Sequence, residues 1–538
     1  MKFENEFTYR KFVESGKEEE FDRLFDEAVQ KAKNTILGKR FPMYIDGKEV
    51  YSNQELLEYS PIDKNILIGK FQKGSREHAT QAINAALKAF KSWSGTGYRE
   101  RASIFRNAAE IFAREKFNVA AILSIENGKT RYESVGEVDE AIDFLRYYAL
   151  ELERNKGYIR RLKLIGSSAK VDAGFQGAPG SKEDITIAMK PYGVFGVIAP
   201  FNFPISISVG MSTGALITGN TVVFKPSSTD NMSMLTGLKI YEIFKEAGVP
   251  DGVFNYITGA GSEVGDEIAM SKDVSGIVFT GSRITGLSML ARNYSTGMQK
   301  VFIVEMGGKN PAIVSKYADL DAAASGIASA AFGFDGQKCS ACSRVYVHES
   351  VKEEFISKLV ERMRSFKIGD PLEKGIYMGP LISEKAHQRF AESVAEAKKN
   401  GNVIYGGNDV PGKNGFYVEP TLVEIDNSSR LFKEELFLPF LVLTTYKKLD
   451  EAIAMANGVE YGLTAGFYSK KKSEIREFLD NIEAGVVYVN RSISATTGAI
   501  VGFHTFVGWK GSGLTGKGTG SKFYLQQFLR EQSEAVVK

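Results

Sequence analysis

The sequence predicts an α/β protein built from two doubly wound parallel sheets, and two observations carry this prediction. Apolar runs of strand length alternate with helix-like stretches over residues 194–304, and the same alternation returns over residues 312–489. Such alternation is typical of parallel sheets that helices cover on both faces. The composition fits a folded chain, because 43% of the 538 residues are hydrophobic and 25% are charged, close to the globular average.

The first unit is predicted from its N-terminal elements onward. Apolar residues recur at helical spacing over 21–36 and again over 82–93, where Ser75 is a candidate cap. Between these helices, Asp46-Gly47 in the stretch PMYIDGKEV indicates a hairpin turn. Five strands follow, with helices such as 232–247 between them; the strands are 194–198, 221–224, 253–257, 276–279 and 301–304.

The second unit is predicted to begin near Glu305. Its strands are expected at 312–314, 344–348, 441–446, 463–468 and 486–489. Residues 165–190 precede the first sheet, are polar and rich in Gly and Ser, and include the strand-like ITIAM. They are expected to form an exposed arm or linker rather than part of a core.

The composition argues against several classes of protein. Two cysteines exclude a disulfide-stapled secreted scaffold, and a formal charge of +3 gives no reason to expect nucleic acid as a partner. Charges near the N-terminus interrupt any secretory signal, so a cytoplasmic location is expected. No metal site is expected, because the histidines are far apart in sequence; they are His78, His348, His387 and His504.

One uncharged stretch is long enough to cross a membrane. No charged residue lies between Lys190 and Lys225. However, Pro200, Pro204 and the pair Gly219-Asn220 divide the stretch into runs of strand length. Such runs are typical of a buried parallel sheet, so no membrane partner is expected.

Polar or flexible residues follow four strands of the first predicted sheet. Each of these strands is followed by a segment that carries Asn202, Lys225, Gly281–Gly286 or Glu305. Open parallel sheets bind ligands beyond the carboxyl ends of their strands, so these positions are predicted to surround a ligand. The segment after Gly281 opens a helix and could bind phosphate, although an ordinary structural turn is an alternative interpretation.

The two cysteines give a sharper indication. Cys339 and Cys342 lie just before a predicted strand, whereas thioredoxin-like redox pairs open a helix. The cysteine pair could be half of a zinc site, but such a site would need a second pair of ligands. The third interpretation is that one cysteine is a nucleophile. No histidine is near it in sequence, so Glu305 is the best apparent acid or base. An inert buried cysteine is the alternative.

Together these residues resemble the NAD(P)-dependent aldehyde dehydrogenase superfamily, over nearly the whole chain from Phe41 onward. The spacing of Glu305 and Cys339 matches that family. The motifs that carry the resemblance are Pro200-Phe-Asn-Phe-Pro204, Phe224-Lys-Pro226, Phe279-Thr-Gly-Ser282 with Gly286, Glu305-Met-Gly-Gly-Lys309, Gly336-Gln-Lys-Cys339, Gly369-Asp-Pro371 with Gly379-Pro380, and Glu434-Glu-Leu-Phe437.

The resemblance implies a set of catalytic roles. Cys339 would attack the aldehyde carbon, and Asn202 with the backbone N–H of Cys339 would stabilise the oxyanion. Glu305 would activate the water that hydrolyses the thioester. Cys342 matches no functional position and is expected to be a packing residue.

The resemblance also implies NAD or NADP as the cofactor. The residues assigned to it are Pro200, Lys225, Ser228, Gly281, Ser282, Glu435 and Phe437. Lys225 matches the ligand of the adenosine ribose, Ser282 the pyrophosphate loop, and Glu435 the ligand of the nicotinamide ribose. Ser228 stands where the family usually has Glu, which leaves the choice between NAD and NADP open.

Within the superfamily, the stretches 333–344 and 490–502 and the long N-terminal helix resemble the 1-pyrroline-5-carboxylate dehydrogenase subfamily. That resemblance implies L-glutamate γ-semialdehyde as substrate. The substrate-binding residues would be Phe203, Ser340, Gly498, Ala499 and Phe506. The chain departs from the pattern at Leu438, at extra residues around 494–496, and over 504–509.

The expected architecture is an aldehyde dehydrogenase-like fold with two α/β domains and a small β oligomerisation arm. Residues 1–164 and 191–303 would form the dinucleotide-binding domain, 304–510 the catalytic domain, and 165–190 with 511–538 the arm. The arm would add strands to a partner subunit in a homo-oligomer, a dimer or higher. The alternatives are a dehydrogenase for another aldehyde (succinate semialdehyde or glyceraldehyde), a catalytically silent binding protein on this fold, and a redox-active C-x-x-C protein.

Overall fold

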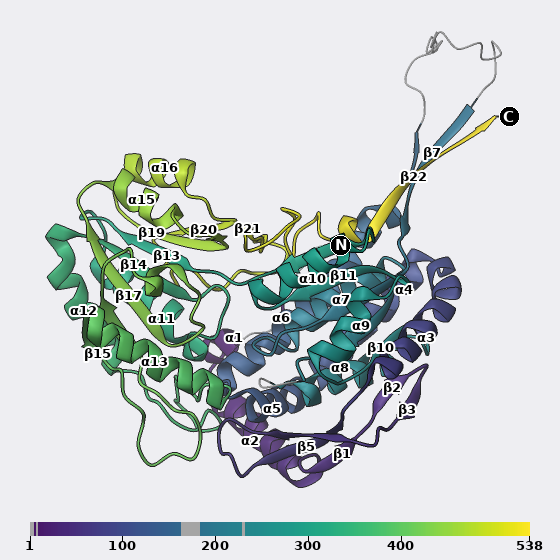
Figure 1. Ribbon diagram of the computed structural model, residues 1–538, viewed down its shortest axis with the longest axis horizontal. Coiled ribbons are helices and arrows are strands. Elements are labelled where there is room, and N and C mark those ends of the chain that lie inside the picture. Colours follow the sequence, from purple (N-terminus) through teal and green to yellow (C-terminus); the bar gives the residue numbers. More distant parts are fainter. Residues whose placement is uncertain (1–4, 7–8, 163–182, 229–231, 538) are drawn as a thin grey trace.

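A computed structural model describes residues 5–6, 9–162, 183–228 and 232–537, and two seven-stranded sheets organise it (Figure 1). The first sheet has the order β12-β11-β8-β9-β10-β2-β3. Its parallel strands confirm the five that the sequence predicted; they are β8 (Val194–Ile198), β9 (Thr221–Lys225), β10 (Phe254–Tyr256), β11 (Val274–Thr280) and β12 (Val301–Glu305).

Helices cover both faces of this sheet, as apolar strands on both sides require. One face packs against α3 (Arg76–Gly95), α9 (Asp266–Met270) and α10 (Arg283–Ser295). The other face packs against α4 (Tyr98–Arg114), α5 (Lys116–Asn127), α6 (Arg131–Arg154), α7 (Ser206–Ile217) and α8 (Met234–Ala247). Ser75 caps α3 by accepting a hydrogen bond from the His78 N–H, as predicted.

The hairpin predicted at Asp46-Gly47 joins β2 (Met43–Ile45) to β3 (Lys48–Val50). Both turn residues have positive φ, 53° for Asp46 and 75° for Gly47. Two left-handed residues match the twist of the flanking strands, so Asp-Gly suits this turn. β2 then pairs antiparallel with β10 and extends the first sheet.

The N-terminal region also holds elements that the sequence analysis missed. These are α1 (Tyr9–Glu14) and a three-stranded sheet of β1 (Lys39–Phe41), β5 (Leu67–Gln72) and β4 (Glu55–Tyr59). The helix predicted over 21–36 is α2 (Glu18–Thr35), and its apolar stripe packs into the first core.

The second sheet has the order β15-β16-β17-β14-β13-β19-β20. Its predicted strands are β13 (Asn310–Val314), β14 (Cys342–His348), β17 (Phe440–Tyr446), β19 (Thr464–Tyr468) and β20 (Val486–Val489). β15 (Asn402–Tyr405) and β16 (Thr421–Glu424) were not predicted. Its helices are α11 (Leu320–Phe332), α12 (Lys352–Arg364), α13 (Glu384–Asn400), α14 (Arg430–Lys433), α15 (Leu449–Asn457) and α16 (Lys472–Asn481).

A second three-stranded sheet projects from the body of the molecule (Figure 1). β7 (Glu183–Pro191) is its central strand and pairs antiparallel with β6 (Ile159–Leu162) and with β22 (Leu529–Val537). The predicted strand ITIAM lies within β7. Residues 165–182 of the predicted arm lie outside the described residues.

Residues 524–528, which the sequence analysis assigned to the arm, pack against the first unit. Tyr524 stacks on Tyr148 with ring centroids 5.4 Å apart, and the Phe528 ring lies 5.3 Å from that of Phe195. Asn220 Nδ2 donates to the Phe528 carbonyl at 2.9 Å. Of the C-terminal segment, the part in the projecting sheet therefore begins at Leu529.

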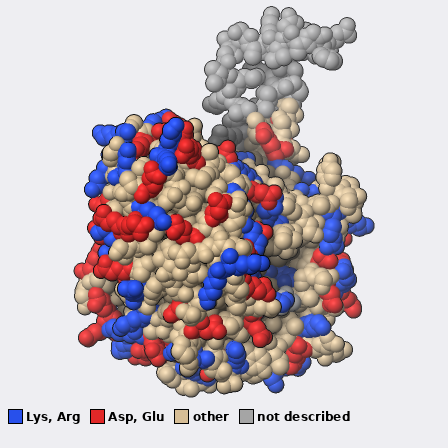
Figure 2. All heavy atoms as spheres, turned by 60° about the vertical axis from the view of Figure 1, so that its left-hand side comes forward, with Lys and Arg blue, Asp and Glu red and all other residues tan. Residues whose placement is uncertain are grey.

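The surface carries charges of both signs. Figure 2 shows acidic and basic side chains interspersed over the face in view, in keeping with the formal net charge of +3. Among the described residues, no helix is long and apolar enough to cross a membrane.

Candidate active site

The candidate site lies where the carboxyl ends of four parallel strands meet a turn of the second unit. β12, β11, β8 and β9 are neighbours in the first sheet and run parallel. Glu305, Gly281, Asn202 and Lys225 lie at or just beyond their carboxyl ends. Cys339 comes from the second unit, on the turn that leads into β14.

The turn that carries Cys339 is held by a residue that the sequence analysis missed. Asn310 Nδ2 donates to the carbonyls of Cys339 at 2.7 Å and Ala341 at 2.9 Å. Because the C=O and N–H of one trans peptide point in opposite directions, this bond turns the Ser340 N–H away from Asn310. The N–H groups of Ser340 and Cys339 contact the thiol and lower its pKa.

The two cysteines have different surroundings. Cys339 is half-buried and Cys342 is buried in β14. Burial raises the pKa of the Cys339 thiol above its usual value, and the carboxyls of Glu435 and Glu305 raise it further. Burial raises the pKa of Cys342 to about 12. Only Cys339 combines partial exposure, acidic neighbours and backbone donors.

Glu305 ends β12 beside this turn. Its Oε2 is buried and has no hydrogen-bond partner among the described residues, and burial raises the pKa of its carboxyl well above the usual range. The Gly281 N–H donates to the Glu305 carbonyl at 3.1 Å. The predicted acid or base is thereby joined to the predicted phosphate loop.

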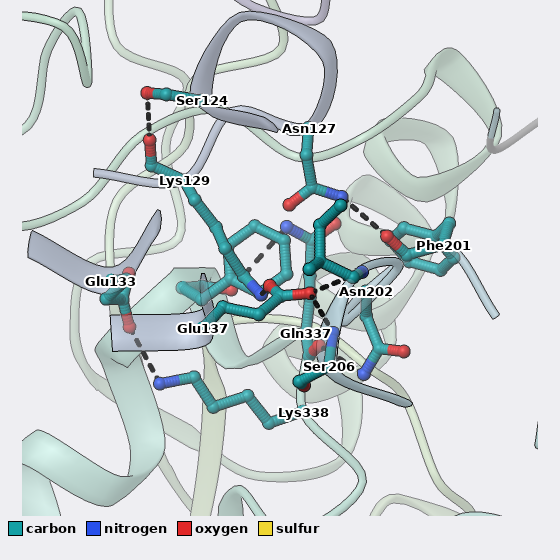
Figure 3. A network of polar contacts seen from close by, with 12 residues as sticks. Ser124, Asn127, Lys129, Glu133, Glu137, Phe201, Asn202, Ser206, Gln337 and Lys338 are labelled. Carbon is teal, nitrogen blue, oxygen red and sulfur yellow. Dashed lines mark hydrogen bonds and ion pairs between the residues drawn. The ribbon is translucent and has the colours of Figure 1, made fainter. Parts of the chain in front are cut away.

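Asn202 reaches the cysteine turn from the first unit (Figure 3). Its Nδ2 donates to the Gln337 carbonyl at 3.1 Å, and the Gln337 side chain accepts from the Ile382 N–H at 2.9 Å. An amide nitrogen carries two hydrogens, so one remains for a ligand. The structure thus brings Asn202, Glu305 and Cys339 into one place.

Asn202 is positioned by a buried polar network that the sequence analysis also missed (Figure 3). Asn127 Nδ2 donates to the Phe201 carbonyl at 2.6 Å. Glu137 Oε1 accepts from the Ile205 N–H at 2.8 Å where α7 begins, and the same carboxylate pairs with Lys129. In the sequence, this network could have been recognised only from charged residues at positions of α6 that are otherwise apolar.

The predicted cofactor residues at the first sheet form a basic and glycine-rich edge. Lys225 is buried, its Nζ donates to the Pro226 carbonyl at 3.2 Å, and burial lowers its pKa to about 8. Ser228 Oγ donates to the same carbonyl at 2.9 Å. Ser282 caps α10 by accepting from the Thr285 N–H at 3.2 Å, one residue after Gly281.

Glu435 and Phe437 extend this edge from the second unit. Glu435 Oε1 accepts from the Gly308 N–H at 2.7 Å. Burial raises the pKa of Glu435 to about 7, against the lowering effect of that N–H and of Lys309. The Phe437 ring lies 5.8 Å from the ring of Phe201, next to Pro200 in the chain.

The predicted substrate residues come from three loops. Ser340 is buried beside Cys339, and its carbonyl accepts from Thr496 Oγ1 at 2.7 Å. Gly498 has φ 84° and precedes Ala499 on the loop after β20. The remaining two are aromatic: the Phe203 ring has Lys129 Nζ 3.5 Å from its centroid, and the Phe506 N–H donates to the Thr519 carbonyl at 3.1 Å.

These residues suit a dinucleotide. The start of a long helix at Ser282 offers N–H groups to phosphate, Lys225 offers an ammonium, and Glu435 offers a carboxylate to ribose hydroxyls. Gly307 has φ 73° and a Cβ there would meet the Glu435 carboxylate, so glycine suits this close approach. The donor set and the cradle therefore fit a nicotinamide dinucleotide.

A family comparison agrees with this geometry. The model of the aldehyde dehydrogenase family matches residues 50–533. The chain belongs to the aldehyde dehydrogenase family.

Individual relatives are more specific. The 1-pyrroline-5-carboxylate dehydrogenase of Geobacillus sp. (strain WCH70) is 36% identical over 519 residues, 96% of each chain. The crystal structure of 1-pyrroline-5-carboxylate dehydrogenase from Thermus with bound NAD is similar at TM-score 0.90 and 32% identity, covering 100% of this chain and 99% of that one. An E. coli NADP-dependent enzyme is similar at TM-score 0.83 and 30% identity, covering 93% and 98%.

Proposed function

We propose that the protein oxidises L-glutamate γ-semialdehyde to L-glutamate, with NAD or NADP as acceptor, in the degradation of proline. The convergence of Cys339, Glu305 and Asn202 at the strand ends carries the proposal. The similarity to 1-pyrroline-5-carboxylate dehydrogenases over 96% of the chain supports the choice of substrate.

Cys339 is the nucleophile in this proposal. After its proton is lost to water, Sγ attacks the aldehyde carbon and the carbonyl oxygen becomes an oxyanion. The second amide hydrogen of Asn202 and the Cys339 N–H stabilise that oxygen. A bound nicotinamide cofactor would accept the hydride that leaves the same carbon, so that a thioester remains on Cys339.

Glu305 completes the cycle. Its carboxylate takes a proton from a water molecule, whose oxygen attacks the thioester carbon. The carbon–sulfur bond then breaks, which releases the carboxylate product and restores the thiolate of Cys339. The unpartnered Oε2 of Glu305 supports this role, because it is an acceptor that no described residue occupies.

The assignment of the cofactor residues rests on their position at the strand ends. Lys225, Gly281 and Ser282 would hold the adenosine and pyrophosphate parts, and Glu435 with Phe437 the nicotinamide end, beside Pro200. Ser228 lacks the negative charge that would repel a 2′-phosphate. We therefore propose that NADP is accepted beside NAD.

The substrate carboxylate would be held by Ser340, Gly498 and Ala499, with Phe203 and Phe506 along the substrate channel. Backbone N–H groups bind carboxylates by charge-assisted hydrogen bonds, and glycine lets the backbone approach a ligand closely.

The predicted organisation belongs to the same proposal. Residues 1–164 and 191–303 serve the dinucleotide, and residues 304–510 carry the catalytic chemistry. The sheet of β6, β7 and β22 joins subunits in a homo-oligomer. A cytoplasmic location is in keeping with two free cysteines, since reducing compartments favour thiols.

The decisive experiment measures NADH and NADPH formation with a panel of aldehydes. Glutamate γ-semialdehyde is expected to exceed hexanal in kcat/KM by about 30-fold or more, because buried donors reject an analogue that lacks their partner. Equal rates for the two aldehydes would contradict the proposed substrate. Titration with both dinucleotides tests cofactor choice: a preference for NAD of about a hundredfold, about 2.7 kcal/mol, would contradict acceptance of NADP.

A further inference from the structure

The loop that carries Gly498 and Ala499 is clamped by an arginine with no assigned role. Arg491 Nη1 donates to the Thr497 carbonyl at 3.2 Å, and Nη2 donates to the Gly498 carbonyl at 3.4 Å. The two nitrogens of one planar guanidinium thus hold two successive carbonyls. A single ammonium group cannot reproduce this fork.

The two contacts of Arg491 also fix the direction of the neighbouring backbone N–H groups. The described backbone has no cis peptide bonds, and in a trans peptide the C=O of one residue opposes the N–H of the next. With the Thr497 carbonyl turned toward Arg491, the Gly498 N–H points away from it. With the Gly498 carbonyl turned toward Arg491, the Ala499 N–H does the same.

These two N–H groups remain available to a ligand. Within the part of the chain that the structure describes, neither of them donates a hydrogen bond, whereas the N–H of Thr497 donates to Ser494 Oγ at 3.0 Å. Gly498 has φ 84°, a conformation that strongly favours glycine. The loop therefore presents two adjacent donors in one fixed arrangement.

The Arg491 guanidinium is itself held in place by its neighbours. The Arg491 guanidinium carbon lies 4.3 Å from the centroid of the Tyr488 ring on β20, within the range of a cation–π contact. The His504 ring packs against the same Tyr488 ring with centroids 6.0 Å apart. His504 Nδ1 accepts from the Ile500 N–H at 3.2 Å, which ties down the far side of the loop.

A second tie joins this loop to the nucleophile. Thr496 is fully buried, and its Oγ1 donates to the carbonyl of Ser340, the residue after Cys339, at 2.7 Å. The loop and the Ser340 side of the site therefore keep a constant separation. A fixed separation is what discriminates one chain length of substrate from another.

We propose that Arg491 is a positioning residue for substrate specificity: it orients the N–H groups of Gly498 and Ala499 toward the carboxylate of an ω-carboxylated aldehyde. The inference rests on the proposed function, since it presumes a substrate with a carboxylate at that loop. Arg491 does not touch the reacting carbon, so it acts on selectivity rather than on the chemical step.

The test compares the ratio of kcat/KM for glutamate γ-semialdehyde to that for hexanal in three variants. Arg491→Met should lower the ratio about tenfold or more, mainly through KM of the semialdehyde, and leave hexanal within about twofold of the native protein. Arg491→Lys should also show most of this decrease in the ratio, because a lysine ammonium cannot hold both carbonyls. Ser492→Ala, an exposed change in the same loop, should alter neither substrate.

Four other results would contradict the proposed role of Arg491 or the proposed function. If Arg491→Met keeps the native ratio, the clamp does not orient the donors. If it slows both aldehydes equally, Arg491 has only a structural role. If Arg491→Lys keeps the full ratio, a positive charge that pairs directly with the substrate explains the data instead. If the native protein shows no preference for the semialdehyde, the proposed function itself fails.

Folding is checked separately from catalysis. The melting temperature of Arg491→Met and its rate with hexanal should both stay near the native values. Inhibition by L-glutamate, the proposed product, gives an equilibrium readout: its inhibition constant should rise about tenfold in Arg491→Met. An unchanged inhibition constant would contradict the orienting role.

Discussion

Cys339 and Cys342 lie close together in sequence, yet only Cys339 has the surroundings of a nucleophile. Cys339→Ala is expected to abolish aldehyde oxidation, because it removes the proposed nucleophile and the other thiol, Cys342, is buried. Cys342→Ala should keep most of the activity and cost stability instead, about 1 kcal/mol, since it removes a buried sulfur. Initial rates and thermal melting of both variants check this. Equal loss of activity would favour a redox pair.

Glu305 is predicted to act in thioester hydrolysis more than in hydride transfer. Glu305→Gln should still release about one reduced cofactor per site in a burst and then turn over slowly, by about a hundredfold, because glutamine cannot take a proton from water. Rapid mixing with absorbance detection separates the burst from turnover. Slow, burst-free hydride transfer would contradict the role in thioester hydrolysis.

The raised pKa of Glu305 predicts the sign of the pH dependence. A carboxyl whose pKa is raised is protonated over a wider range, and only its carboxylate can act as base. The turnover rate should therefore rise as pH rises through that pKa, and Glu305→Gln should lack this limb. A native profile that falls over the same range would contradict the assignment.

Among the helices, α8 has an unusual N-terminal cap. The Leu235 N–H donates to Glu126 Oε1 at 2.6 Å, and the Met234 N–H donates to Glu58 Oε1 at 3.4 Å. Both carboxyls are buried and hydrogen-bonded to one another, and burial raises the pKa of each. The pair is therefore stable when it retains a proton.

This cap predicts a stability that falls with increasing pH. A carboxyl whose pKa is raised in the folded state contributes stability below its usual pKa of 4.5. That stability is lost as pH rises through the raised pKa, by about 1.4 kcal/mol for every pH unit between the two values. Glu58→Gln keeps a proton at the pair, so its melting temperature should exceed the native one at pH 9 and not at pH 5. Glu77→Gln, an exposed change, is the control; equal slopes for all three proteins would contradict the prediction.

The sheets were predictable where their strands are buried on both faces. β8 and β9 are continuous apolar runs with turn residues at their ends. The pattern of apolar residues along the sequence is therefore enough to predict them. β1 and β15 were missed because they are short and carry exposed or charged residues such as Lys39 and Asn402. Their strand conformation comes from pairing with distant segments, which local sequence does not reveal.

The same distinction applies to the site. Cys339, Glu305 and Asn202 were predictable because motifs place them after strands. Asn310 and Glu137 were not, because their roles depend on backbone groups far along the chain, at Cys339 and Ile205. Contacts of this kind become visible only when segments that are far apart in the chain are folded together.

For the molecule as a whole, β22 is the feature that predicts assembly. It is an edge strand of the projecting sheet, with β7 on one side only. An exposed edge offers unpaired N–H and C=O groups to another chain. Deleting residues 530–538 should lower the molar mass measured by light scattering, whereas deleting only 537–538 should not. An unchanged mass for the longer deletion would contradict a role of this edge in assembly.

The packing of Tyr524 and Phe528 against α6, α7 and β8 bears on how the chain folds during synthesis. Phe195 and the neighbouring strands emerge from the ribosome hundreds of residues before their partners at the C-terminal end. Domains generally fold as units in the order of synthesis, but here the part of the first core that packs against Tyr524 and Phe528 is not covered until those residues have been made. We therefore expect the first unit to expose this apolar patch while the second unit is being synthesised, and to need its C-terminal partner segment before its core is complete.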